Sequence, residues 1–376
     1  MDAVATPSET SGGWLARFVI GVFLLLPGLL LYSAVQLKPV LDTVAYSRTD
    51  FNALSESEFV GMANYNRLAE DQIFSEGVRF TLNILLVRLV IVALIPPLVG
   101  MLVGAQGRLG RMVNQVLLAV IGVLISPVAL AILASSFLSP FWGNQPSPFE
   151  ARILASVETA PLAIMTVDAM ITLALAAVVG GSAFIAVMRG RRERVSIARA
   201  LVGVWLLGLL FTLLTAPQTF ILPFIMTRGG PANATMTMSL AFYQNAFAFF
   251  SLGYASAQAV LWVAIAEIAA LLIWAVLVFF RLHLVVTPPL KAAQNTNSLA
   301  VVSVPLVLLI GLPTIGLALW GFAQAGLSSS PELNVGQAFA NTVTIPWTAI
   351  WLVQIPLTYM IGLSLGFVRP ISKFFF

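Results

Sequence analysis

Three charged side chains, Arg88, Asp168 and Glu267, lie inside long apolar segments of the sequence. A charge within a membrane-spanning helix is costly and often marks a solute path, a proton relay or a paired counter-ion. Arg88 and Asp168 lie at matching depths of about 10 Å, at 1.5 Å per residue, in segments that start on the same side. We therefore expect these two side chains to form an ion pair. All three residues are candidates for a translocation path; the alternative for Glu267 is a carboxyl that is protonated or hydrogen-bonded to a neighbour.

Five arginines lie close together in the short segment 189–199, between two apolar stretches. They are Arg189, Arg191, Arg192, Arg194 and Arg199. Such a basic loop is typical of a topology anchor on the cytoplasmic side of a membrane. The alternative is a contact with an acidic protein face or with anionic lipid headgroups.

The sequence lacks the residues on which most enzyme and metal sites depend. Cysteine is absent and His283 is the only histidine. The patterns G-x-x-x-x-G-K-[ST], G-x-S-x-G and H-E-x-x-H do not occur. We therefore expect no catalytic residue, no metal and no cofactor. The pI near 9.7 reflects loop arginines, and no nucleic-acid partner is expected.

The composition predicts a polytopic membrane protein. Of the 376 residues, 59% are hydrophobic and only 9% are charged, whereas soluble domains carry about 25% charged residues. Unbroken apolar runs exclude a transmembrane barrel, whose strands alternate apolar and polar residues. The predicted fold class is all-α, a bundle of about eight transmembrane helices. The predicted spans are 14–37, 81–104, 115–138, 161–188, 200–225, 258–280, 299–323 and 342–367.

The loop charges predict an orientation. If the N-terminus is cytoplasmic, the cytoplasmic segments hold 12 Lys and Arg, whereas the opposite loops hold 6. This bias satisfies the positive-inside rule, so both termini are predicted to be cytoplasmic.

Two loop segments carry a family signature. Residues 226–235 read M-T-R-G-G-P-A-N-A-T, and 252–257 read L-G-Y-A-S-A. They resemble the permease subunits of sugar-type ATP-binding cassette (ABC) importers, the maltose and glycerol-phosphate group, in which an M-T-x-G-G-P-x-x-x-T stretch precedes a G-Y-A-S-A start of a span. The residues that carry the resemblance are Thr227, Gly229, Gly230, Pro231, Gly253 and Tyr254.

An earlier stretch is similar to the first external loop of the same family. It comprises S-R-T-D-F-N at 47–52, E-F-V-G at 58–61, N-Y at 64–65 and F-T-L-N at 80–83. With these motifs the resemblance covers about residues 14–281. It implies the fold of a type I ABC importer permease over six helices.

The sequence departs from that family at two places. The loop 189–199 lacks the E-A-A-x-x-x-G motif and is too short for the usual ATPase-docking helix, so we expect at most a weak ATPase contact there. Residues 299–376 resemble only the start of a second permease domain. The predicted division is a permease-like domain over 1–286, a polar cytoplasmic linker over 287–298 and two further helices over 299–376.

The resemblance implies a subunit of a bacterial carbohydrate importer in the inner membrane, working by alternating access. It implies four kinds of partner: a second permease subunit, a cytoplasmic ABC ATPase dimer, an extracytoplasmic substrate-binding protein and membrane lipid. ATP would be hydrolysed by the separate ATPase, so the chain itself is not expected to be an enzyme. The alternative is a degenerate, permease-derived structural or accessory subunit of another membrane complex.

Overall fold

The computed structural model describes residues 11–52, 57–104, 151–189 and 197–282, together with a few positions between 348 and 360. Within these ranges the secondary structure is helical, apart from one antiparallel bridge between Thr49 and Phe59. The chain divides into two compact units, Met1–Ala45 with Ser329–Phe376, and Tyr46–Ser328. The expected all-α fold class is confirmed for the described residues.

The first unit contains a long apolar helix. Helix α1 (Ser11–Tyr32) passes through a π-helical turn, η1 (Ser33–Leu37), into α2 (Lys38–Tyr46). From Phe18 to Leu31 the side chains of α1 are apolar on all sides, as expected for a helix surrounded by lipid or protein. In α2 the Lys38 ammonium pairs with the Asp42 carboxylate at 2.6 Å, one helical turn further on. A short π-helical segment, η7 (Ile350–Gln354), is also described.

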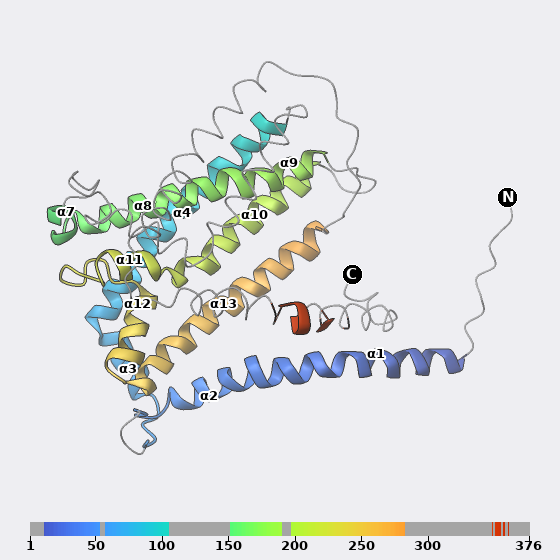
Figure 1. Ribbon diagram of the computed structural model, residues 1–376, viewed down its shortest axis with the longest axis horizontal. Coiled ribbons are helices and arrows are strands. Elements are labelled where there is room, and N and C mark those ends of the chain that lie inside the picture. Colours follow the sequence, from blue (N-terminus) through green and yellow to red (C-terminus); the bar gives the residue numbers. More distant parts are fainter. Residues whose placement is uncertain are drawn as a thin grey trace. The chain divides into compact units, whose positions relative to one another are not determined.

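The second unit is a bundle of long and short helices (Figure 1). Its elements in chain order are α3 (Ala63–Glu70), α4 (Gln72–Gly104), α7 (Ala151–Ala155), α8 (Ala160–Leu175), η3 (Ala176–Gly180), α9 (Gly181–Arg189), α10 (Ile197–Thr215), η4 (Ala216–Gln218), α11 (Ile221–Met226), α12 (Met238–Tyr243), η5 (Gln244–Ala248) and α13 (Leu252–Phe280). Helix α4 packs against α8, α9 and α10, and α10 packs against α13. Small residues permit these close approaches: a Cβ on Gly181 would lie 2.6 Å from the Val99 side chain.

Five helical segments are long and apolar enough to cross a membrane. They are Phe18–Tyr46, Gln72–Met101, Ala160–Met188, Ile197–Met226 and Leu252–Phe280. They coincide with five of the eight predicted spans. Of the other three, 115–138 and 299–323 lie outside the described residues, as do most residues of 342–367. The predicted linker 287–298 also lies outside them, so the domain boundaries remain a prediction.

Two span boundaries were wrong for a physical reason. Helix α4 begins well before residue 81, because the Asp71 carboxylate accepts the backbone N–H groups of Ile73 and Phe74 at 2.8 and 3.2 Å. This cap supports a first helical stretch that hydropathy alone excludes. Helix α13 likewise begins at Leu252 instead of near residue 258.

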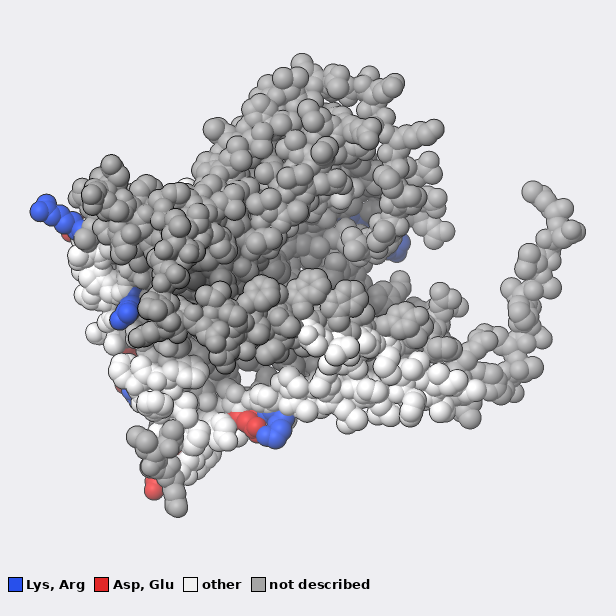
Figure 2. All heavy atoms as spheres, viewed as in Figure 1, with Lys and Arg blue, Asp and Glu red and all other residues white. Residues whose placement is uncertain are grey.

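The outer faces of the long helices are apolar. Leu86, Val90 and Leu94 on α4 and Leu271 on α13 are each more than half exposed. Figure 2 shows that the described surface in view carries few charged side chains. Apolar surface of this extent is typical of contact with lipid or with another membrane-embedded chain.

Candidate functional site

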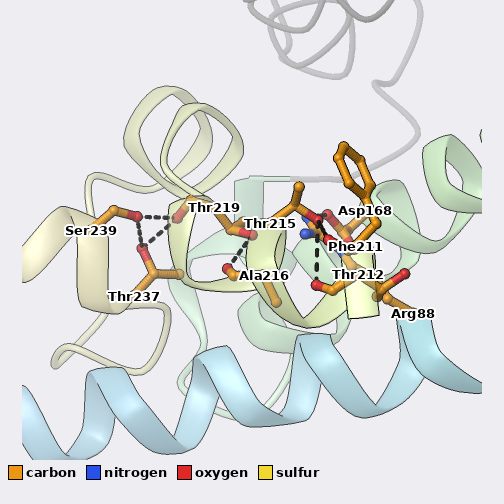
Figure 3. A network of polar contacts seen from close by, with 9 residues as sticks. All are labelled: Arg88, Asp168, Phe211, Thr212, Thr215, Ala216, Thr219, Thr237 and Ser239. Atoms are coloured by element: carbon orange, nitrogen blue, oxygen red, sulfur yellow. Dashed lines mark hydrogen bonds and ion pairs between the residues drawn. The ribbon is translucent and has the colours of Figure 1, made fainter. Parts of the chain in front are cut away.

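The predicted pairing of Arg88 with Asp168 is confirmed. Arg88, on α4, donates from Nε to Asp168 Oδ2 at 2.8 Å and from Nη2 to Oδ1 at 2.5 Å (Figure 3). The Asp168 side chain on α8 is 4% exposed and that of Arg88 is 16% exposed. This two-bond geometry is the strongest that a guanidinium makes with a carboxylate. The pair joins two long helices and leaves neither charge alone among apolar side chains.

Glu267 stands apart from this pair. It lies on α13 in an exposed position, next to Ile268, which is 60% exposed. Within the described residues no hydrogen bond or ion pair reaches its carboxylate. The structure therefore brings two of the three candidate intramembrane charges together and leaves the third on an outer face.

The Thr227–Pro231 motif builds a tight loop between α11 and α12. Gly229 has φ near +90°, and a Cβ there would lie 2.8 Å from the Met236 methyl group. The Thr227 and Thr235 hydroxyls are 2.6 Å apart, and that of Thr235 donates to the Gly230 carbonyl at 2.7 Å. The motif residues thus close the loop on itself, with Gly229 supplying a conformation that L side chains rarely adopt.

The end of this loop and the start of α12 are hydrogen-bonded to the segment that follows α10. The hydroxyls of Thr237 and Ser239 both donate to the Thr219 carbonyl, at 2.7 and 2.6 Å (Figure 3). Thr219 follows the short turn η4, where Pro217 interrupts the helix. The buried Thr219 carbonyl, left without a helical partner, is therefore satisfied by side chains from another segment, as a broken helix at membrane depth requires.

Gly253 and Tyr254 fix the start of α13 against two other segments. The Gly253 N–H donates to the Phe51 carbonyl at 2.8 Å, and a Cβ on Gly253 would lie only 2.0 Å from the Thr49 carbonyl oxygen. The Tyr254 hydroxyl donates to the Asp71 carboxylate at 2.5 Å, and the Arg67 guanidinium lies 4.3 Å from the centre of the tyrosine ring. Gly253 and Tyr254 therefore both hold the start of α13 in place.

Residues of the earlier loop motif join segment 46–52 to helix α3 by hydrogen bonds. The Asn64 side-chain amide donates to the carbonyls of Ser47 and Thr49 at 3.0 and 2.7 Å. The Ser47 and Tyr65 hydroxyls are 2.7 Å apart. We call segment 46–52, helix α3, the loop 227–237 and helix α12 the cap of the second unit.

The basic loop is described only at its edges. Arg191, Arg192 and Arg194 lie outside the described residues, and of Arg189 only the backbone at the end of α9 is described. Arg199, on α10, donates to the Phe279 carbonyl at 2.5 Å, and its guanidinium lies 5.1 Å from the centre of the Phe279 ring. Arg199 therefore joins α10 to the end of α13.

Sequence reasoning missed a cavity of about 780 Å³ at the cap. One side carries Asn66, Arg67, Glu70 and Asp71 from α3 and its end, and the other carries Gln244 and Asn245 from η5. Amide and carboxylate groups supply both hydrogen-bond donors and acceptors, and Phe249 adds an aromatic ring. In the described part of the chain no cluster of His, Asp or Glu could hold a metal ion.

A second missed feature lies on helix α13. Gln258 on α13 is fully buried, yet its amide nitrogen and oxygen have no hydrogen-bond partner among the described residues, and the same holds for the indole nitrogen of Trp262. The signal in the sequence was the spacing of Tyr254, Gln258 and Trp262, four residues apart in a mostly apolar helix.

Comparisons with known proteins give two partial similarities. The chain is 47% identical over 53 residues to the sulfoquinovosyl glycerol transport system permease protein SmoG of Agrobacterium fabrum, covering 14% of this chain and 17% of that protein. It is 45% identical over 47 residues to a putative ABC transporter permease protein of a Caldicellulosiruptor species, covering 12% of this chain and 34% of that protein. The matches thus span about a third or less of the relatives' own lengths. No protein-family model matches the chain.

Proposed function

We propose that this chain is a permease subunit of a carbohydrate-type ABC importer and forms part of the path along which solute crosses the inner membrane by alternating access. The observation that carries the proposal is the partial similarity to two ABC permeases in a chain with five candidate membrane helices. The name of the Agrobacterium relative favours a glycoside as the class of solute.

In the proposed importer this chain forms part of the solute path and does not itself hydrolyse ATP. A second permease subunit completes the path, an external binding protein delivers solute, and a cytoplasmic ABC ATPase dimer hydrolyses ATP. Arg88 and Asp168 keep α4 and α8 together without a net charge inside the membrane.

Glu267 is proposed to face protein. A carboxylate near the middle of a span is costly to expose to hydrocarbon. Its position on an outer face of α13 therefore suits a contact with the second permease subunit, with the solute path or with a neighbouring hydrogen-bond donor.

The proposed orientation places the cap outside the cell and segment 189–199 in the cytoplasm. Single cysteines at Glu70 and Arg192 test this, because the chain has no cysteine of its own. We expect a membrane-impermeant thiol reagent added to intact spheroplasts to label Glu70→Cys, and Arg192→Cys to react only after permeabilisation. Labelling of both from the same side would overturn the topology.

The composition of the purified complex tests the function. We expect the full chain, purified through an affinity tag, to bring a second permease subunit and an ABC ATPase at about 0.1 M salt. At about 1 M salt the Debye length falls from about 10 to about 3 Å, and an ATPase held by exposed arginines should be lost. Such contacts are individually worth about 0–1 kcal/mol. Subunits are counted by mass spectrometry in both preparations.

Two variants give this test a control. Arg192→Ala with Arg194→Ala should mimic high salt, whereas Arg152→Ala, on the opposite loop side in the proposed orientation, should leave the ATPase in place. Retention of ATPase through segment 189–199 at high salt would contradict the weak-contact expectation. Absence of any ABC ATPase at low salt would contradict the importer function and favour the accessory-subunit alternative.

A further inference from the structure

One face of α13 carries three side chains able to form hydrogen bonds, four residues apart. Tyr254, Gln258 and Trp262 follow one another along the same face of the helix. The contacts of the two aromatic residues show where this face points: Tyr254 packs with Leu68 of α3, and Trp262 lies 5.4 Å from the ring centre of Phe242 on α12. The face therefore points into the bundle below the cap.

Two of the three polar side chains on this face lack a hydrogen-bond partner in the described part of the chain, whereas the third, Tyr254, is bound to Asp71. Gln258 is fully buried, and both its amide atoms, like the Trp262 indole N–H, lack a partner among the described residues. A buried polar group without a partner costs free energy that a leucine of similar size would not cost. Such an arrangement fits side chains whose hydrogen-bond partners arrive with a ligand.

Residues that line the cap cavity contact the first side chain of this face. Asp71 and Arg67 line the cavity, and both also contact Tyr254. Tyr254 thus lies between residues that line the cavity and the two further members of the row, Gln258 and Trp262. Eight residues separate Tyr254 from Trp262, a rise of about 12 Å along the helix at 1.5 Å per residue.

We infer that Tyr254, Gln258 and Trp262 form a hydrogen-bonding track for the hydroxyl groups of a polyhydroxylated, carbohydrate-like solute that enters from the cap cavity. The inference rests on the proposed permease function and names a site for it. The track suits hydroxyls because Gln258 offers two N–H donors and one carbonyl acceptor, and Trp262 offers one donor. Neither residue carries a charge that would compensate an ion.

Access of water to Gln258 tests the track. We expect Gln258→Cys, in the full-length protein in lipid vesicles, to react with a negatively charged methanethiosulfonate reagent added on the cap side. The reaction should be at least about tenfold faster than for Ala257→Cys, because a thiol reacts as the exposed thiolate. Ala257 is equally buried at the same depth, but on another face of the helix. Leu261→Cys, at an exposed apolar position, is the second control. Equal rates for Gln258→Cys and Ala257→Cys would overturn the track.

Protection by solute tests the ligand class. Glucose, maltose and glycerol are each added at high concentration, with betaine, which has no hydroxyl group, as the control. We expect at least one of the three polyols to slow labelling of Gln258→Cys by about threefold or more, a change of the size expected for a weak site. Labelling without protection by any of them would overturn the solute assignment.

The variant Gln258→Leu shows whether a loss of solute binding could instead reflect a failure of the protein to fold. It removes the two unpartnered atoms at similar volume, so we expect its Tm without polyol to equal or exceed that of the unmodified chain. The rise in Tm on adding polyol should be smaller than in the unmodified chain, because only the nonspecific effect common to osmolytes remains. A lower Tm for Gln258→Leu would indicate a structural partner and contradict the inference. Water access at Gln258 in a complex without ATPase would leave the track standing and contradict only the importer function.

Discussion

Replacing Asp168 by leucine will destabilise the bundle by about 3–5 kcal/mol, because the Arg88 guanidinium then remains buried without a partner. Arg88→Leu is expected to cost a similar amount by leaving the Asp168 carboxylate unpaired. The double variant Arg88→Leu with Asp168→Leu should recover most of the loss, since two apolar side chains can replace a buried ion pair at little cost. Thermal unfolding in detergent, with all variants at equal concentration, measures the differences.

The exposed pair Lys38–Asp42 supplies the matched control. Its two charges are 2.6 Å apart, but the side chains are 72% and 43% exposed. Lys38→Leu should therefore cost no more than about 1 kcal/mol. If Asp168→Leu were as harmless as Lys38→Leu, or if the double variant were no better than either single one, the pair would not be the structural link between α4 and α8.

The same double variant separates structure from transport. A protein with both residues replaced that is stable and still takes up solute places the pair outside the translocation path. A stable protein that has lost uptake places it within the path. Glu267→Gln is the parallel test for the exposed carboxyl on α13, where no intrachain partner among the described residues would be lost.

The ion pair could be predicted from the sequence because the membrane imposes a simple constraint. Two opposite charges at equal depth in apolar spans must be neutralised, and pairing is the least costly way. Depth in a span does not tell which face of the helix a side chain occupies, so the rule could not place Glu267 on an outer face. Apolar length likewise located five spans, but hydropathy could not detect the capped polar start of α4 at Asp71.

The cap cavity could not be predicted in this way. Most of its lining comes from short helices and loops that are not membrane spans, and it joins residues as distant in sequence as Asn66 and Asn245. The burial of Gln258 was not predicted for a related reason. The span was expected to begin at residue 258, whereas α13 begins at Leu252 and buries that side chain. Tertiary contacts of Gly253 and Tyr254 set that boundary, and hydropathy does not record them.

Gly253→Ala is expected to destabilise the cap by about 2–4 kcal/mol, a large effect for a single methyl group. The added Cβ would lie 2.0 Å from the Thr49 carbonyl oxygen and 3.0 Å from the Phe51 nitrogen. Both are backbone atoms, held by the Asn64 amide and by the Gly253 N–H bond to Phe51. Neither can move aside as the end of a flexible side chain would, so the segment 46–52 must leave the start of α13.

A second glycine shows that the effect comes from this contact and not from the residue type. Gly208 lies within α10, and a Cβ there would meet only the Val92 side chain, at 3.3 Å. Gly208→Ala should therefore be neutral or slightly stabilising, because alanine favours a helix by about 0.8–1.0 kcal/mol over glycine. Thermal unfolding compares the two variants, and equal Tm values would contradict the prediction. Since Tyr254 follows Gly253 directly and its hydroxyl is bound to Asp71, displacement of segment 46–52 should also loosen the wall of the cap cavity at Asp71. Gly253→Ala should then speed the labelling of Gln258→Cys, whereas Gly208→Ala should leave it unchanged.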